Sequence, residues 1–117
     1  MKESIIKNKS FIFALSIIKV YSFLIDNKEF VLSKQLLRSG TSIGANVNEA
    51  LAAESKADFI HKMAIASKEA RETIYWLELL EKSQIVSNDY EILTNECSEL
   101  CKILTSIVKT TKMNQKS

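Results

Sequence analysis

Two cysteines and one histidine are the residues of this chain that could bind a metal ion or form a disulfide. Cys97 and Cys101 are four residues apart, a spacing that places both side chains on one face of a helix. A disulfide between them would be strained in that geometry, and a zinc site needs three or four ligands, whereas His61 is far away in the sequence. We therefore predict two buried apolar thiols, no metal site and no cofactor.

Acidic residues and nucleophiles do not form a recognisable catalytic pattern in the sequence. Glu49 has no histidine near it, and no nucleophile is accompanied by a base. Ferritin-like metal enzymes carry Glu-x-x-His pairs, and this chain has none. We predict a protein without catalytic residues and without enzyme activity.

The stretch RSGTSIGAN, residues 38–46, differs from the rest of the chain because it contains both glycines. Gly40 and Gly44 share one helix face and cost the helix roughly 2 kcal/mol relative to alanine. Small residues on one face let another backbone come close, so we interpret this pair as tight packing within a bundle. A polar stripe runs beside the glycines at near-heptad spacing and consists of Gln35, Ser39, Ser42, Asn46 and Glu49, with Arg38 adjacent.

Two interpretations of this polar stripe remain open from the sequence. It fits a buried hydrogen-bond network that fixes register or subunit contacts, and it fits an ordinary solvated face equally well. Arg38, Asn46 and Glu49 are accordingly candidates for assembly or for ligand contact.

Composition favours a single helical domain. The chain has 117 residues, of which 46% are hydrophobic and 26% charged, and it contains no proline. β-Sandwiches and α/β folds depend on glycine and proline in their turns, so the near absence of both residues argues against them. A net charge of +2 is too small for a protein dedicated to binding polyanions.

Apolar periodicity predicts four helices, at residues 3–26, 34–54, 56–82 and 89–112. The expected N-caps are Ser33, Ser55 with Asp58 in the capping-box position, and Ser87 or Asn88. Short connections make neighbouring helices antiparallel, which predicts an all-α, up-down-up-down four-helix bundle that forms one domain over residues 1–117.

The predicted first helix is apolar on two sides. One stripe contains Phe11, Ala14, Ile18, Tyr21 and Ile25, and a second stripe contains Phe13, Ile17, Val20 and Leu24. Two stripes indicate contact with the helix's own bundle and with another molecule, and we expect subunits to meet through the second stripe and parts of the second and third helices.

The same segment does not fit the pattern of a membrane span or of a signal peptide. Its uncharged runs, residues 10–18 and 20–25, are shorter than the ~18 apolar residues that a span needs, and no small-residue cleavage site follows. We predict a cytoplasmic protein that does not contact a membrane.

Lysines are concentrated near the two ends of the chain. Residues 1–19 contain four lysines and one acid, residues 102–117 contain four lysines and no acid, and residues 81–99 contain five acids and one lysine. In an antiparallel bundle the two lysine-rich segments lie at the same end, which predicts a basic pole and an acidic pole. The helix dipole accounts for lysines at the end of the last helix but not for those at the start of the first. The predicted basic pole consists of Lys2, Lys7, Lys9, Lys109, Lys112 and Lys116.

Several short motifs in the second and third predicted helices carry a resemblance to a known family. They comprise Gln35, Leu36 and Arg38; Ser42, Ile43, Asn46 and Glu49; Ser55, Lys56 and Phe59; and Glu69, Glu72, Trp76 and Leu77. At these residues the sequence resembles the four-helix-bundle protein family, also called the 23S rRNA intervening-sequence protein family. The match is close over these two helices and extends to the other two only in pattern.

The resemblance implies a small bacterial protein of unknown biochemical function that assembles in rings of five and has no enzyme activity. A related branch, the accessory protein of diversity-generating retroelements, is a basic pentameric barrel that binds reverse transcriptase and nucleic acid. The resemblance therefore makes RNA or DNA, and a protein such as a reverse transcriptase, the partners to consider beside the chain itself.

These observations predict a non-enzymatic homo-oligomeric scaffold, most simply a pentamer, with weak and nonspecific binding of RNA or DNA at the basic pole. Aligned poles in a ring would form a cationic rim whose attraction for phosphates depends strongly on salt. The alternative is a protein-interaction adaptor for which nucleic acid is incidental.

Overall fold

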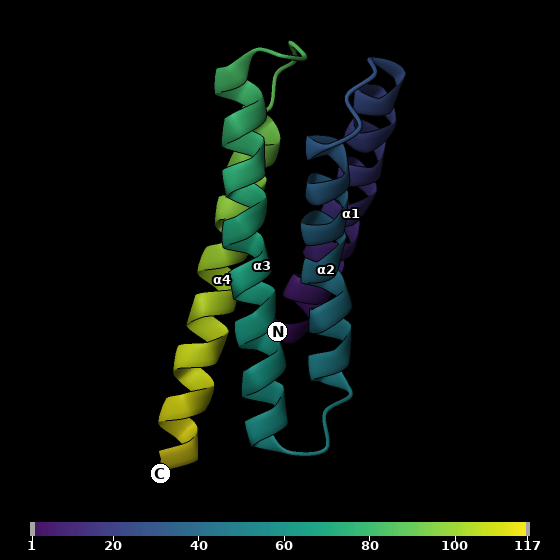
Figure 1. Ribbon diagram of the computed structural model, residues 1–117. Helices are drawn as coiled ribbons and strands as arrows, with labels where there is room; N and C mark the ends of the chain where they lie inside the picture. The colour runs from purple at the N-terminus through teal and green to yellow at the C-terminus, as the bar shows by residue number, and fades with distance from the viewer. Residues whose placement is uncertain (1, 117) are drawn as a thin grey trace.

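The structure is a computed structural model that describes the backbone of residues 2–116 and the side chains of residues 3 and 5–114. The chain forms four helices: α1 (Lys2–Asp26), α2 (Leu32–Leu51), α3 (Lys56–Ser83) and α4 (Glu91–Lys116). Neighbouring helices run antiparallel in an elongated bundle of 51 × 21 × 21 Å (Figure 1). The predicted all-α, up-down-up-down four-helix bundle is confirmed.

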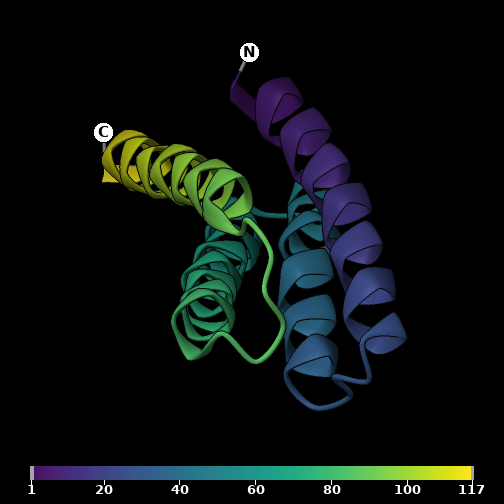
Figure 2. The same ribbon diagram turned by 90° about the horizontal axis from the view of Figure 1, so that it is seen from above.

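Each helix packs mainly on its neighbour in the sequence. The contact between α2 and α3 is the most extensive, and the contact between α1 and α4 is the smallest. Seen from above, α1 and α2 form one side of the bundle and α3 and α4 form the other, with the start of α1 and the end of α4 well apart (Figure 2). The junction of α3 and α4 therefore lies on the other side of the bundle from the junction of α1 and α2.

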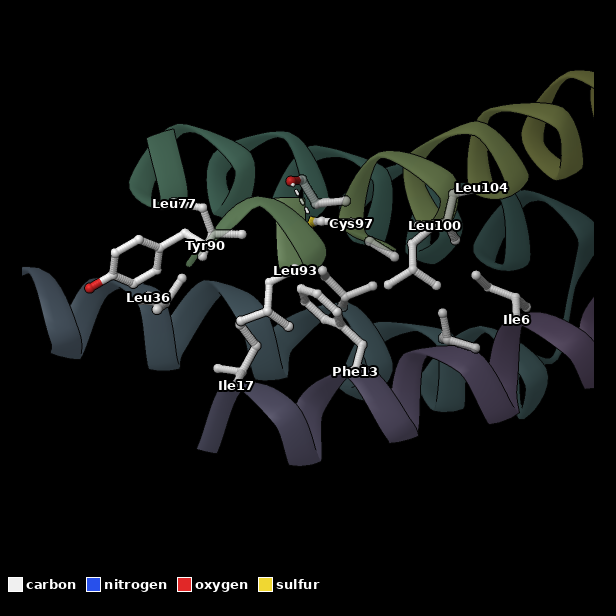
Figure 3. Close-up of a cluster of buried hydrophobic side chains, with 14 of the residues drawn as sticks. Ile6, Phe13, Ile17, Leu36, Leu77, Tyr90, Leu93, Cys97, Leu100 and Leu104 are labelled. Carbon is white, nitrogen blue, oxygen red and sulfur yellow. Dashed lines mark hydrogen bonds between the residues drawn. The ribbon is translucent and has the colours of Figure 1, made fainter. Parts of the chain in front are cut away.

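The core is a single cluster of apolar side chains from all four helices (Figure 3). It contains one thiol, because Cys97 is fully buried and its Sγ lies 3.2 Å from the carbonyl oxygen of Ala70. Burial, with a smaller contribution from Cys101, raises the pKa of the Cys97 thiol to about 12, so the thiol is protonated at neutral pH. Cys101 is partly buried and both cysteines are free, so the predicted buried thiol is confirmed fully at Cys97 and partly at Cys101.

The predicted N-cap of α3 is confirmed, whereas that of α2 is wrong. The backbone N–H of Asp58 donates to Ser55 Oγ over 3.1 Å, as the capping interpretation requires. The helix α2 begins before Ser33, whose own backbone N–H donates to the side chain of Glu29 over 2.6 Å. Glu29 can reach this position because Lys28 adopts a left-handed conformation (φ 65°), which ends α1 and turns the chain back.

The start of α4 also differs from the prediction. The helix begins at Glu91, and Asp89 rather than Ser87 or Asn88 accepts the hydrogen bond from the Glu91 N–H, over 3.0 Å. The buried Tyr90 fixes this start, because its ring packs in the core and its hydroxyl donates to the carbonyl oxygen of Val86 over 2.7 Å. Burial raises the pKa of the Tyr90 hydroxyl, and the negative charges of Glu81 and Glu29 raise it further.

The two apolar stripes of α1 are both real, but their roles are the reverse of the prediction. Phe13, Ile17 and Leu24, from the second stripe, are buried in the core of the bundle itself, so this stripe is not available for contacts between subunits. In the first stripe, Phe11 is 62% exposed and Ile18 is 48% exposed. The expectation that subunits meet through the second stripe is therefore wrong.

Candidate functional site

The outward side of α1 carries large apolar side chains that the bundle does not cover. Their exposed fractions range from 37% for Phe23 to 62% for Phe11. We call this set the apolar α1 face; it comprises Ile5, Phe11, Ile12, Leu15, Ile18 and Phe23. By length and composition alone, Ile5–Asp26 is also long and apolar enough to cross a membrane.

A groove of about 530 Å³ follows the junction of α1 and α2 beside this face. Phe11 and Lys7 line it from α1, and Thr41, Ala45 and Asn48 line it from α2. Lys7 therefore borders an apolar groove and does not line the hollow that contains Lys109 and Lys112 near the end of α4.

The two glycines of α2 bring α1 and α2 close together. A Cβ atom on Gly40 would lie 2.8 Å from Cγ1 of the fully buried Ile17, a distance that real Cβ atoms essentially never show. A Cβ atom on Gly44 would lie 3.4 Å from the carbonyl oxygen of Ser10, near ordinary contact distance. Tight packing within the bundle therefore requires glycine at position 40, as the sequence predicts. The packing at Gly44 is looser and leaves nearly enough space for a Cβ atom.

The polar stripe of α2 divides into a buried part and a solvated part. Ser39 is fully buried and accepts a hydrogen bond from Thr73 Oγ1 of α3 over 2.9 Å. Ser42 and Asn46 donate to carbonyl oxygens of their own helix, and Glu49 is exposed. Each of the two interpretations left open by the sequence therefore describes part of the stripe.

Arg38 forms the centre of an ion-pair cluster that joins α2 to α3. Its guanidinium contacts the carboxylate of Glu72 and lies 3.5 Å from that of Glu69, and it also donates to the side chain of Gln35. Trp76 Nε1 donates to the same Glu72 carboxylate over 3.1 Å. The family-motif residues of the two helices thus contact one another directly, which gives them a structural role in this interface.

The lysines of the predicted basic pole lie in different surroundings. Lys9 forms an ion pair with Glu99 over 2.6 Å, whereas Lys109 and Lys112 line a shared hollow of about 390 Å³ between α3 and α4. The side chains of Lys2 and Lys116 lie outside the described residues.

The hollow between α3 and α4 also contains a cation that the sequence interpretation missed. Arg71 lines it from α3 and donates to Oγ of the buried Ser67 over 3.0 Å. A neighbouring hollow along α4 shares Thr105 and Lys109 and adds Lys102. We call these two hollows together the cationic groove. The signal in the sequence was the acid-free run of residues 102–117; Arg71 could join it only once the packing of α3 on α4 was known.

Among the residues that the structure describes, no group of three or more His, Cys, Asp or Glu side chains is placed to hold a metal ion. The titratable groups with resolved shifts, Tyr90 and Cys97, both lie in the core.

Comparison with known proteins identifies a family and solved structures that are similar to this chain. The family model for the 23S rRNA-intervening sequence protein matches residues 2–106. A crystal structure of a protein with unknown function from the S23 ribosomal protein family of Bacteroides thetaiotaomicron VPI-5482 shares 53% sequence identity and superposes with a TM-score of 0.89. That similarity covers 93% of this chain and 99% of the Bacteroides chain. No curated protein matches. The match over nearly the whole chain and the shared bundle establish that this protein belongs to the 23S rRNA-intervening sequence protein family.

Proposed function

We propose that the protein is a non-enzymatic scaffold that acts as a homo-oligomer, in the ring of five that the family resemblance implies. The observation that carries this proposal is the apolar α1 face. Leu15 is 48% exposed, and Ile12 and Phe11 are exposed by 58% and 62%, although all three are large apolar side chains. Contiguous exposed apolar surface of this kind is characteristic of interaction sites.

The groove between α1 and α2 supports a second copy as the partner for this face. Its lining combines the ring of Phe11 with the small residues Ala14, Gly44 and Ala45, which leave room for an inserted apolar side chain. The apolar α1 face and this groove lie next to each other, so copies related by rotation could each present the face and accept it. The interface of the ring would then leave α3 and α4 on the outside.

Light scattering coupled to size-exclusion chromatography tests the assembly. The wild-type chain is expected at a multiple of 13.2 kDa, and the Phe11→Asp/Ile18→Asp variant is expected at or near the monomer mass. The matched control is Ile85→Asp/Ile92→Asp, which places the same charges on exposed isoleucines that belong neither to the apolar α1 face nor to the groove between α1 and α2, and it should leave the assembly intact. A wild-type monomer at micromolar concentration, or recovery only with lipid vesicles, would refute the proposal.

Nucleic-acid binding is a second candidate activity of the same scaffold, supported by the lysines near the end of α4. Lys109 and Lys112 line a surface hollow together with Arg71, and none of the described residues that line this hollow is acidic. Such a surface attracts phosphates without reading sequence, and its affinity falls steeply with salt. The alternative is a protein-interaction adaptor whose partner, such as a reverse transcriptase, docks on the ring.

A pull-down from the native host distinguishes these two activities when it is analysed by both sequencing and mass spectrometry. Recovery of RNA or DNA that survives removal of co-purified proteins supports direct nucleic-acid binding. Recovery of one stoichiometric protein after nuclease treatment, with no protected nucleic acid, favours the adaptor.

A further inference from the structure

We infer that the cationic groove between α3 and α4 binds the phosphates of a nucleic-acid strand. This inference rests on the nucleic-acid binding proposed above and locates it in a groove along the side of the bundle, which contains Lys109 and Lys112 of the predicted pole and adds Arg71 and Lys102. The groove joins two surface hollows, of about 390 and 410 Å³, which share Thr105 and Lys109. Its cations are Arg71, Lys102, Lys109 and Lys112.

The cations of the groove are available to a ligand. The ion pairs found in the described part of the chain involve Lys9 and Arg38, and none involves a cation of the groove. No acidic residue stands three or four positions from Arg71, Lys109 or Lys112, and Glu99, three positions before Lys102, forms its ion pair with Lys9. Uncompensated positive charges at one surface repel one another, and a bound polyanion would relieve that repulsion.

Arg71 is positioned at the wall of the groove by a contact to the bundle. One of its terminal nitrogens, Nη1, donates to Ser67 Oγ over 3.0 Å, and Ser67 is only 5% exposed. The guanidinium has five N–H donors, so this bond leaves others free to form a bidentate contact with a phosphate. Thr105 lines the opposite wall of the groove, and its hydroxyl donates to the carbonyl oxygen of Cys101 over 2.8 Å, so the cations are the donors that face a ligand.

The spacing of the lysines along α4 fits one strand. Lys102 and Lys109 are seven residues apart on one helix face, and Lys112 follows one turn later. Ten residues at 1.5 Å per residue make the row about 15 Å long, so the three lysines can contact different phosphates of one strand, with Arg71 facing them from α3.

The lining also indicates that the groove does not recognise the bases of the strand. Beside the cations and hydroxyls it contains Ala64, Val108 and Cys101, and no aromatic residue is among the lining residues that the structure describes. Without an aromatic platform the bases have no stacking partner, so the contact would be to the backbone of the strand and would be independent of sequence.

Fluorescence anisotropy with a labelled single-stranded RNA, measured over a series of salt concentrations, tests the groove. We expect Lys109→Gln/Lys112→Gln to weaken binding by about tenfold at low salt and to reduce the slope of log K against log salt by about 1.4, or about 0.7 for each lost contact to a single strand. The matched control, Lys19→Gln/Lys34→Gln, removes the same charge from exposed lysines outside the groove and should change the affinity less than threefold. Arg71→Gln should weaken binding. Arg71→Lys should weaken it less, because the positive charge remains but the bidentate contact of the guanidinium with a phosphate is lost.

The outcomes separate this inference from the function on which it rests. If the wild-type protein does not bind RNA at low salt, nucleic-acid binding itself is wrong. If the wild type binds but the groove variant and the control variant lose affinity equally, the binding is diffuse and the groove is refuted while the function stands. Competition by polyglutamate of equal charge that is as strong as competition by RNA would overturn the assignment to phosphates.

Discussion

The two sides of α2 hold their neighbouring helices by different means. Toward α1, Gly40 leaves space that the buried side chain of Ile17 fills, so the contact is one of shape. Toward α3, a buried hydroxyl pair and an exposed ion-pair cluster join the helices through directional bonds, at Ser39 and at Arg38. Shape sets how closely two helices approach, whereas paired polar groups set which residues lie opposite one another. The following substitutions test whether this division of roles holds.

The largest effect is expected at Ile17, which supplies the shape on the α1 side. Ile17→Ala removes a fully buried side chain from the space above Gly40 and leaves a cavity in a well-packed interface. We expect a loss of about 2–5 kcal/mol in the free energy of unfolding, measured by urea denaturation. A loss below about 1 kcal/mol would mean that α1 collapses freely onto α2 and that the fit is not specific.

Gly40→Ala tests the same contact from the other helix. The added methyl group would approach the β-branched, stiff side chain of Ile17, so overpacking of about 1–3 kcal/mol should outweigh the gain of up to ~1 kcal/mol in helix propensity. Gly44→Ala is the matched control, because its methyl group meets Ser10 at 3.4 Å, and should be neutral or stabilising. Equal stabilisation by both substitutions in thermal denaturation would show that close approach does not require Gly40.

A smaller effect is expected from the hydroxyl pair on the α3 side. Thr73→Val keeps the shape of the side chain but leaves the buried Ser39 hydroxyl without its donor from α3, which should lower the free energy of unfolding by about 1–2 kcal/mol. Adding Ser39→Ala should restore most of that loss, because no unpaired hydroxyl remains. A double variant that is less stable than either single variant would contradict this reasoning.

The smallest effect is expected at Arg38. Its side chain is 49% exposed, so water screens its ion pairs with Glu69 and Glu72. We expect Arg38→Gln to cost at most about 1 kcal/mol, and the difference from wild type to shrink at high salt. A larger loss in the free energy of unfolding that does not change with salt would show that Arg38 stabilises the protein through packing of its side chain and not through its ion pairs.

Most of the fold follows from the sequence because the apolar periodicity of α2, α3 and α4 indicates one face of each helix as the buried face. The two errors at helix starts have different causes: the side chain of Glu29 caps α2 locally from the preceding turn, and the burial of Tyr90 in the core sets the start of α4. Periodicity did not decide which stripe of α1 is buried, because the stripes of Phe11 and Phe13 both carry large apolar side chains. Which stripe is buried depends on the space that Gly40 of α2 leaves for the side chain of Ile17 of α1. This fit is a property of the two helices together.

The candidate sites were less predictable for the same physical reason. Charge counts along the chain indicated lysines near the end of α4, but Lys9 is paired with Glu99 across two helices, and Arg71 joins Lys109 only through the packing of α3 on α4. A count along the sequence contains no information about such pairs unless the register between helices is known.

The order in which the helices touch one another also has a consequence for how the chain folds. The three most extensive contacts join helices that are consecutive in the sequence, and the single contact between the first and last helices is the smallest. Such a topology has a low contact order, for which folding times of microseconds to milliseconds are typical. Closure of α1 against α4 requires the longest loop and contributes the least surface, so it is expected to be the last step of folding and the first contact to open.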